Sequence, residues 1–453
     1  MTKSYAVIGS GFRAFCNCLH LSENKDAKVY MIAPAKNFGG VMNSRKVGEF
    51  YVDNGVHMFD SIPSALGEII SDIMQNKILD IDFVSESSFG GKITEGFSLP
   101  DLSALPDEQI NIIRSELISV KDTKINASEI VSVHDYFLTL YGVTAGKIFI
   151  DIFKRLYNVD PKLIHKDAIS TTSLARLKFM DDASMLELKS MSSRLDNTLA
   201  ARRKAQGKLD DFVSIYPKSP LGMRGWCENA KPWLEKQRNV EFLLQNNLED
   251  IEVKGDKLLL KISSGELLVD HIIWANDDYS KLAEIFDLTS SPDNYFHHVP
   301  MVFVTLVTAK KFIKNFTYIQ NFNHDGICNR FAASGIYSDQ VTTKGLSFIT
   351  AECPTSIGGD TWESHETLHN QVWEEAKSLG VVAQNAKLEG FDTIRVPKTV
   401  KMKMIKFDEK YATFRKELRE KSKGVIVSEK VPFFRREIFL QSKDMFGVIN
   451  DRA

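Results

Sequence analysis

The first sixty residues constrain the fold more than any other part of the sequence. A short apolar run at residues 5–8 ends in a glycine turn, Gly-Ser-Gly-Phe-Arg-Ala, at residues 9–14. A second apolar run follows at residues 29–32. Because parallel strands need a crossover connection, usually a helix, this spacing predicts a strand, a helix and a parallel strand. The chain therefore begins with a βαβ unit.

The small residues of the glycine turn each meet a physical need. Gly9 permits a tight turn, Gly11 lets a phosphate approach the backbone, and Ala14 lets the helix lie close to the strand. The helix begins at Phe12 and Arg13, where unpaired N–H groups and a partial positive charge attract phosphate oxygens. In this context the motif predicts a dinucleotide-binding turn. The alternative is an ordinary turn between a strand and a helix.

A second glycine turn, Gly39-Gly40, follows the second apolar run, and residues 52–59 then read Val-Asp-Asn-Gly-Val-His-Met-Phe. Together with the first turn, this pattern resembles the two-part FAD fingerprint of the flavin amine oxidase superfamily. That superfamily includes protoporphyrinogen oxidases, phytoene desaturases and UDP-galactopyranose mutases. The resemblance implies that FAD is the cofactor and that Gly39 and Gly40 lie near its pyrophosphate. It places His57 beside the flavin, where it forms a hydrogen bond or moves a proton.

Two positions depart from the superfamily pattern. Ala33 stands where a glutamate normally binds the adenosine ribose, and Val41 stands where an arginine often follows the glycine pair. A hydrogen bond to a charged group contributes roughly 1.5–3 kcal/mol, so the missing carboxylate weakens cofactor binding unless other groups replace it. Nearby Lys36 suits a 2′-phosphate as an alternative. A third outcome is that the chain binds no cofactor.

Length and composition set the remaining bounds. At 453 residues the chain exceeds one ordinary domain, and a net charge of -2 argues against a dedicated nucleic-acid binder. No run of 18 or more apolar residues appears, so no transmembrane segment is predicted. The chain enters its first strand within a few residues, which leaves no room for a signal peptide. The five scattered cysteines suggest reduced thiols in a cytoplasmic protein.

Residues 216–276 carry a second part of the resemblance. They resemble the middle block of the superfamily, with a strand near Leu248 whose backbone would contact the adenine. The expected class is α/β, with a Rossmann-like FAD-binding domain of the GR2 type and an interleaved substrate domain of mixed sheet plus helical insertion. The FAD-binding domain is expected at 1–75, 205–290 and 400–453. The helical insertion is expected at 76–204, and the sheet at 291–399.

The C-terminal residues 437–453 resemble the last strand of the superfamily and the acidic turn that follows it. This resemblance places Asp444 near the ribityl and pyrophosphate parts of FAD. The chain then stops where a final helix should begin. We therefore expect either that the helix is dispensable or that a partner, including a second copy in a homodimer, completes this surface.

The resemblance implies an FAD-dependent oxidoreductase that acts on a small amine or sugar-derived substrate. An alternative is a flavin-dependent nucleotide-sugar mutase, in which Arg176 and Arg330 bind an anionic, nucleotide-linked substrate. Another alternative is a catalytically reduced member of the superfamily that acts as a binding or scaffold protein. His57 and Arg330 are the candidate catalytic residues. No zinc or serine-hydrolase motif appears, and no metal is expected.

Overall fold

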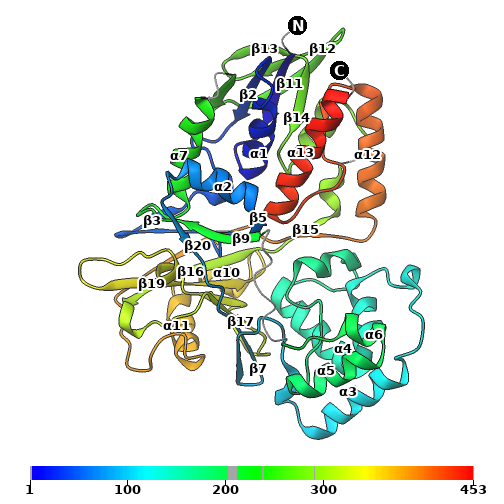
Figure 1. Cartoon of the computed structure of the whole chain (residues 1–453), viewed down its shortest axis with the longest axis vertical. Helices are drawn as coiled ribbons and strands as arrows, with labels where there is room; N and C mark the ends of the chain where they lie inside the picture. The colour runs from blue at the N-terminus through cyan, green and yellow to red at the C-terminus, as the bar shows by residue number, and fades with distance from the viewer. Residues whose placement is uncertain (1–2, 203–211, 237–238, 290, 452–453) are drawn as a thin grey trace. The chain divides into compact units, whose positions relative to one another are not determined.

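The computed structural model describes residues 3–202, 212–236, 239–289 and 291–451. The chain forms two compact units, each assembled from segments far apart in sequence; Figure 1 shows the first in blue, green and red and the second in cyan and yellow. The first unit comprises Met1–Ile81, Leu209–Asn294 and Asp408–Ala453. The second comprises Asp82–Lys208 and Tyr295–Phe407.

The first unit is built on a five-stranded parallel sheet with the order β10-β2-β1-β14-β22. Numbered along the chain, these strands have the order 3-2-1-4-5, which is that of a Rossmann fold. The last four residues of β1 are all buried, as expected for a strand covered on both faces. The predicted fold class is thus confirmed. The strands are β1 (Lys3–Ile8), β2 (Ala27–Ala33), β10 (Val240–Leu244), β14 (His271–Trp274) and β22 (Val425–Ile426).

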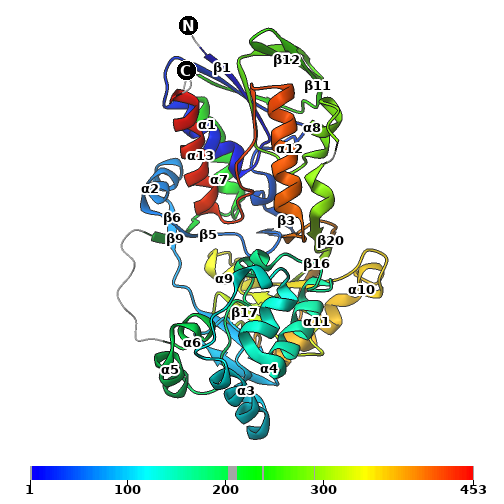
Figure 2. The same cartoon turned by 90° about the vertical axis from the view of Figure 1, so that its right-hand side faces the viewer.

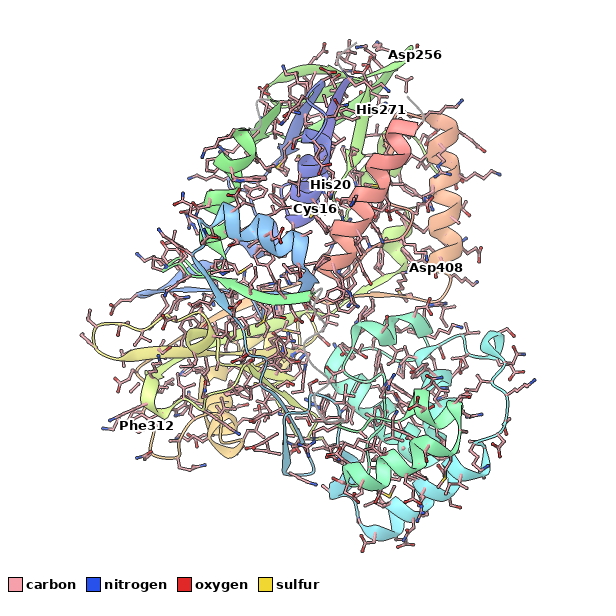
Figure 3. All side chains as sticks on the ribbon, in the orientation of Figure 1. Cys16, His20, Asp256, His271, Phe312 and Asp408 are labelled. Atoms are coloured by element: carbon pink, nitrogen blue, oxygen red, sulfur yellow. The ribbon has the colours of Figure 1, made fainter. Side chains whose placement is uncertain are left out.

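Helix α1 (Phe12–Ser22) follows β1 and is almost completely buried. Helix α13 (Arg435–Asp451) packs along it, as both cartoon views show (Figures 1 and 2). The ring of His20 on α1 lies 5.0 Å from the ring of Phe439 on α13, and Figure 3 shows His20 and Cys16 on the same helix. The other helices of this unit are α2 (Ser64–Ile73), α7 (Arg224–Glu235), α8 (Ser280–Ile285) and α12 (Phe407–Lys421).

The final helix corrects the prediction for the C-terminus. Residues 437–450 were expected to form a strand and a turn, but they lie within α13. Glu437 stabilises the start of this helix, because its carboxylate accepts hydrogen bonds from the backbone N–H groups of Phe433 and Phe434. The last strand of the sheet is instead β22. The final helix is therefore present, and a partner is not needed to supply it.

Smaller sheets complete the first unit. Only Asp270 separates β14 from the preceding β13, and its carboxylate accepts hydrogen bonds from Ser4 N and Oγ, both 2.7 Å long. These contacts turn the chain from a hairpin sheet into the parallel sheet. The additional strands are β3 (Arg45–Val47), β4 (Phe50–Val52), β5 (Phe59–Pro63), β6 (Ile78–Asp80), β9 (Phe212–Pro217), β11 (Leu248–Lys254), β12 (Lys257–Ile262) and β13 (Gly265–Val269).

The second unit contains a seven-stranded mixed sheet with the order β20-β16-β19-β18-β17-β7-β8. One face packs against α11 (Leu368–Ser378) through a buried apolar cluster that includes Val304, Phe331 and Val372. The strands are β7 (Ser85–Phe89), β8 (Lys92–Glu95), β16 (Met301–Ala309), β17 (Tyr318–Asn321), β18 (Arg330–Ala332), β19 (Leu346–Pro354) and β20 (Gly390–Val396), and a separate pair joins β15 (Phe296–His298) to β21 (Lys401–Lys403).

The predicted helical insertion is present in the second unit. Its longest helix, α4 (Val133–Tyr157), is apolar enough to cross a membrane by length and composition alone. Gly142 has φ 79° and ψ -179°, which breaks α4 into two shorter segments, and the helix contributes Phe137, Phe149 and Phe153 to a buried core. These features are those of a core helix. The remaining helices are α3 (Asp107–Ser119), α5 (Asp182–Met191), α6 (Ser193–Thr198), α9 (Ser334–Tyr337) and α10 (Asp360–Glu363).

Candidate functional site

The carboxyl edge of the parallel sheet is the expected position for a ligand, because open α/β sheets bind ligands where the strand order reverses. That point lies between β1 and β14. Gly9 follows β1 with φ 136°, and a Cβ atom there would lie 2.9 Å from the carbonyl oxygen of Ala275, the residue after β14. The Gly9 N–H donates to Ile32 O at 2.9 Å. Only glycine fits this position without displacing the neighbouring strands.

The two glycine turns contact each other directly at this edge. The Gly39 N–H donates to Ser10 O at 2.7 Å, and Gly39 forms an isolated parallel bridge with Gly11. A Cβ on Gly40 would lie 3.1 Å from Gly11 Cα. One on Gly39 would lie 2.2 Å from Cys227 Sγ. The contact therefore requires that Gly39 and Gly40 carry no side chains.

The N-terminus of α1 has the properties of an anion site. Gly11 is its N-cap, no side chain caps it, and its first turn contains no acidic residue. A Cβ on Gly11 would meet no atom within 4 Å, so space remains beside this backbone. A phosphate fits there, next to the N–H groups that follow, including those of Phe12 and Arg13.

Arg13 adds a cation to the same turn. Its side chain is only 10% exposed, and its Nη1 lies 2.9 Å from Asp277 Oδ1 in the loop after β14. Burial alone would lower the pKa of Arg13, but Asp277 outweighs burial and the pKa is raised. The Nε atom is buried without a hydrogen-bond partner among the described residues. This donor set fits a pyrophosphate. The neighbouring Ala14 is completely buried, as its predicted role in close packing requires.

The other predicted cofactor residues are less concentrated. Ala33 is the last residue of β2 and is buried, and its methyl side chain offers no carboxylate to a ribose. Its backbone carbonyl accepts a hydrogen bond from Asn246 N at 3.0 Å. Val41 is 72% exposed, within a short helix at Gly40–Met42. Leu248 begins β11 and pairs with Ile262.

Asp444 does not follow a strand. It is exposed on α13, whereas the acidic residue that follows the last strand, β22, is Glu429. The prediction that Asp444 follows the last strand was therefore wrong. The signal that the sequence offered is the apolar run at residues 425–427, which precedes Ser428 and Glu429.

Asp53 is the centre of a buried polar network that was not predicted. Its carboxylate accepts hydrogen bonds from Ser44 Oγ at 2.5 Å and from Tyr216 Oη at 2.8 Å. These bonds join the β3–β4 hairpin to β9, and Ser44 Oγ also accepts from Arg224 N at the start of α7. Burial raises the pKa of Asp53 to about 6, despite these hydrogen bonds and the charge of Arg435.

Arg435 is the second functional candidate that sequence reasoning missed. It is the first residue of α13, and its Nη2 lies 3.1 Å from His57 Nδ1. Its Nε and Nη2 atoms also lie 3.3 and 3.2 Å from Met42 Sδ. Burial lowers the pKa of Arg435 to about 10. The structure thus brings His57 to the segment that follows the second glycine turn, together with a cation from the end of the chain.

An aromatic cluster supports the first glycine turn from within the fold. Trp226 on α7 is fully buried, and its ring lies 5.9 Å from that of Phe12 and 5.1 Å from that of Phe15. Phe38, just before Gly39, lies 5.7 Å from Trp226, and Phe59 lies 5.3 Å from it. Such ring pairs contribute about 0.5–1.5 kcal/mol each beyond the burial of apolar area. The cluster therefore holds α1, both turns and α7 together.

In the second unit, Arg330 is paired rather than available as an isolated cation. On β18, it donates to both oxygens of Glu352 on β19, at distances of 2.6 to 3.0 Å. Burial alone would lower the pKa of Arg330, but the Glu352 carboxylate raises it. On the neighbouring strands, Gln320 pairs with Arg330 and Ser87 pairs with Gln320. Four polar residues on one face of the sheet therefore form a line across four strands, called the polar row below: Ser87, Gln320, Arg330 and Glu352. Arg176 lies in a loop and is exposed.

No family model and no curated protein sequence matches the chain. Solved structures nevertheless align over its whole length. A reduced UDP-galactopyranose mutase is 14% identical, with a TM-score of 0.75 over 100% of this chain and 95% of that chain. A redesigned putrescine oxidase is 10% identical, with a TM-score of 0.63 over 100% of both chains. Cyclohexylamine oxidase from Brevibacterium oxydans IH-35A is 11% identical, with a TM-score of 0.62 over 100% of this chain and 99% of that chain.

These likenesses define the class of fold. The chain has the Rossmann-type fold that these amine-oxidase-like flavoenzymes share, which confirms the resemblance in fold inferred from the two glycine turns. Within that class, the likeness extends to oxidases and to a mutase at similar levels of identity. A proposal for the specific reaction must therefore be argued from the residues of this chain.

The contact between the glycine turns predicts a large effect of Gly39→Ala. The φ of 119° is strained for alanine, and the new Cβ would overlap Cys227 Sγ. We expect a loss of roughly 2–4 kcal/mol in the free energy of unfolding, measured by urea denaturation. Gly48→Ala is the matched control, because Gly48 also has positive φ but no atom near its Cβ position. Cys227→Ala should recover part of the loss only in the Gly39 variant, and equal losses in both glycine variants would contradict the contact.

Asp53 predicts a pH-dependent stability. Its folded pKa of about 6 exceeds the ordinary value of 3.8, so its contribution to folding is fully present below pH 4 and is lost as the pH rises through 6. Asp53→Asn cannot titrate. The variant should therefore gain about 3 kcal/mol relative to the wild type between pH 4 and pH 7, measured by urea unfolding at each pH. Asp60→Asn, at an exposed position, should show no such change. A constant difference for Asp53→Asn would contradict the shift.

Proposed function

We propose that the protein is an FAD-dependent oxidoreductase. The observation that carries the proposal is the direct contact of two glycine turns beside the uncapped N-terminus of α1. There the backbone N–H groups and Arg13 would hold the pyrophosphate, and His57 would lie beside the flavin. The flavin would supply the redox chemistry when bound, while the protein positions it and its substrate. The residues of the glycine turns fit this group, although Ala33 provides no ribose carboxylate.

The substrate side of the proposal rests on the polar row in the second unit. Ser87, Gln320, Arg330 and Glu352 offer hydrogen-bond donors and acceptors on one sheet face. Because Glu352 neutralises Arg330, the row suits hydroxyl or amine groups better than a phosphate. A small amine or sugar-derived substrate is therefore favoured. A cytoplasmic location and a homodimer remain predictions.

A nucleotide-sugar mutase is the second candidate. It is supported by the similarity in fold to UDP-galactopyranose mutase. It requires that Arg330 contact a nucleotide diphosphate while it stays paired with Glu352. Titration calorimetry with UDP provides the test: tight binding that Arg330→Met abolishes would favour the mutase, and no binding would remove it.

The absorption spectrum of the purified protein tests the cofactor, with mass spectrometry of the material that heat releases. We expect a flavin spectrum and free FAD. A colourless protein that gains no flavin signal after incubation with FAD would contradict the proposal and favour a binding or scaffold role.

Gly11→Ala tests the position of the cofactor. Gly11 has φ -88° and an open Cβ position, so the added methyl group fits the protein without FAD but occupies the space predicted for phosphate. We expect FAD affinity to fall about tenfold or more, which corresponds to about 1.4 kcal/mol, while the melting temperature of the apoprotein stays nearly unchanged. Flavin fluorescence titration and thermal unfolding measure the two quantities. Unchanged FAD affinity would place the cofactor elsewhere.

A further inference from the structure

The contact between Arg435 and His57 determines which nitrogen of the imidazole ring carries the proton. Arg435 Nη2 lies 3.1 Å from His57 Nδ1. A guanidinium group has donors only and does not lose its proton at physiological pH. His57 Nδ1 must therefore accept this hydrogen bond, and the proton of the neutral ring lies on Nε2. An imidazolium ring would place two donors face to face beside a second positive charge.

Arg435 is fixed independently of His57. It begins α13, and the carboxylate of Glu437 caps that helix start through the N–H groups of Phe433 and Phe434. Its guanidinium lies 6.0 Å from the ring of Phe59. It also contacts Met42 Sδ. The negative charges of Asp53 and Asp60 act on Arg435 and partly offset the effect of burial on its pKa. Both carboxylates accept hydrogen bonds from other side chains, Asp53 from Ser44 and Tyr216 and Asp60 from Ser214.

We propose that Arg435 is a positioning residue that holds His57 as a neutral hydrogen-bond donor through Nε2. This inference rests on the proposed function for its purpose, because a flavin ring presents carbonyl oxygens and unprotonated nitrogens that accept such a bond. It narrows the role of His57 to one of the two that the resemblance implied. With Nδ1 occupied and Nε2 already protonated, His57 binds the ligand and does not act as a general base.

The test is ¹⁵N NMR of histidine-labelled protein at neutral pH, with the full chain and without added FAD. The chain has 10 histidines, and the signal that His57→Gln removes assigns the ring. We expect an unprotonated Nδ1 and a protonated Nε2 in the wild type. Arg435→Lys keeps a donor and should keep this signature. Arg435→Met removes the donor and should replace it with a mixture of tautomers. Arg436→Met is the matched control on the exposed neighbouring position and should change nothing.

A wild-type signature with the proton on Nδ1 would overturn the proposal without any variant, so a misfolded Arg435→Met protein does not prevent a decision. The same signature in folded Arg435→Met as in the wild type would also overturn it. The measurement needs no cofactor. A protein that shows the expected tautomers but binds no FAD would sink the proposed function and leave the Arg435–His57 pairing intact.

Discussion

The approach of the two glycine turns is the constraint on which the first unit depends. Gly39 reaches Ser10 and Gly11 with no side chain between them, and Cys227 closes the remaining space. This contact fixes the segment after β2 against the start of α1. The hairpin, the Asp53 network and His57 all follow that segment in sequence. Their positions relative to the sheet edge are therefore set by a backbone contact that leaves no space for a side chain at Gly39 or Gly40.

The electrostatics of the unit build on that framework. Positive charge collects near the turns, with the uncapped end of α1, Arg13 and Arg435. Asp277 balances Arg13 at 2.9 Å, and the buried Asp53, whose pKa is raised to about 6, interacts with Arg435. The uncapped N–H groups of α1 have no such partner among the described side chains, so this end of the helix favours an anionic ligand. A redox cofactor with a pyrophosphate meets that description.

Much of this unit could be predicted from sequence because its signals are local. A few consecutive residues were enough to predict the turn at residues 9–14, the strand at residues 29–32 and the turn at Gly39-Gly40. The prediction of a strand at the C-terminus was wrong for a local reason too. Ile438, Phe439 and Leu440 form an apolar run that suits a strand as well as a helix. The pairs Arg330–Glu352 and Arg435–His57 could not be predicted from the sequence, because only the tertiary fold brings their residues together.

The order of the strands also has a consequence for how the chain is made. Strand β1 pairs with β14, whose residues come 266 positions later, and β22 and α13 join only when residues 425–451 have been synthesised. Contacts of such long sequence separation fold slowly, and an incomplete parallel sheet exposes an unpaired edge. During synthesis the β14 edge therefore stays unpaired until residues 425–426 have been made. An unpaired edge of this kind is a site at which incompletely folded chains aggregate.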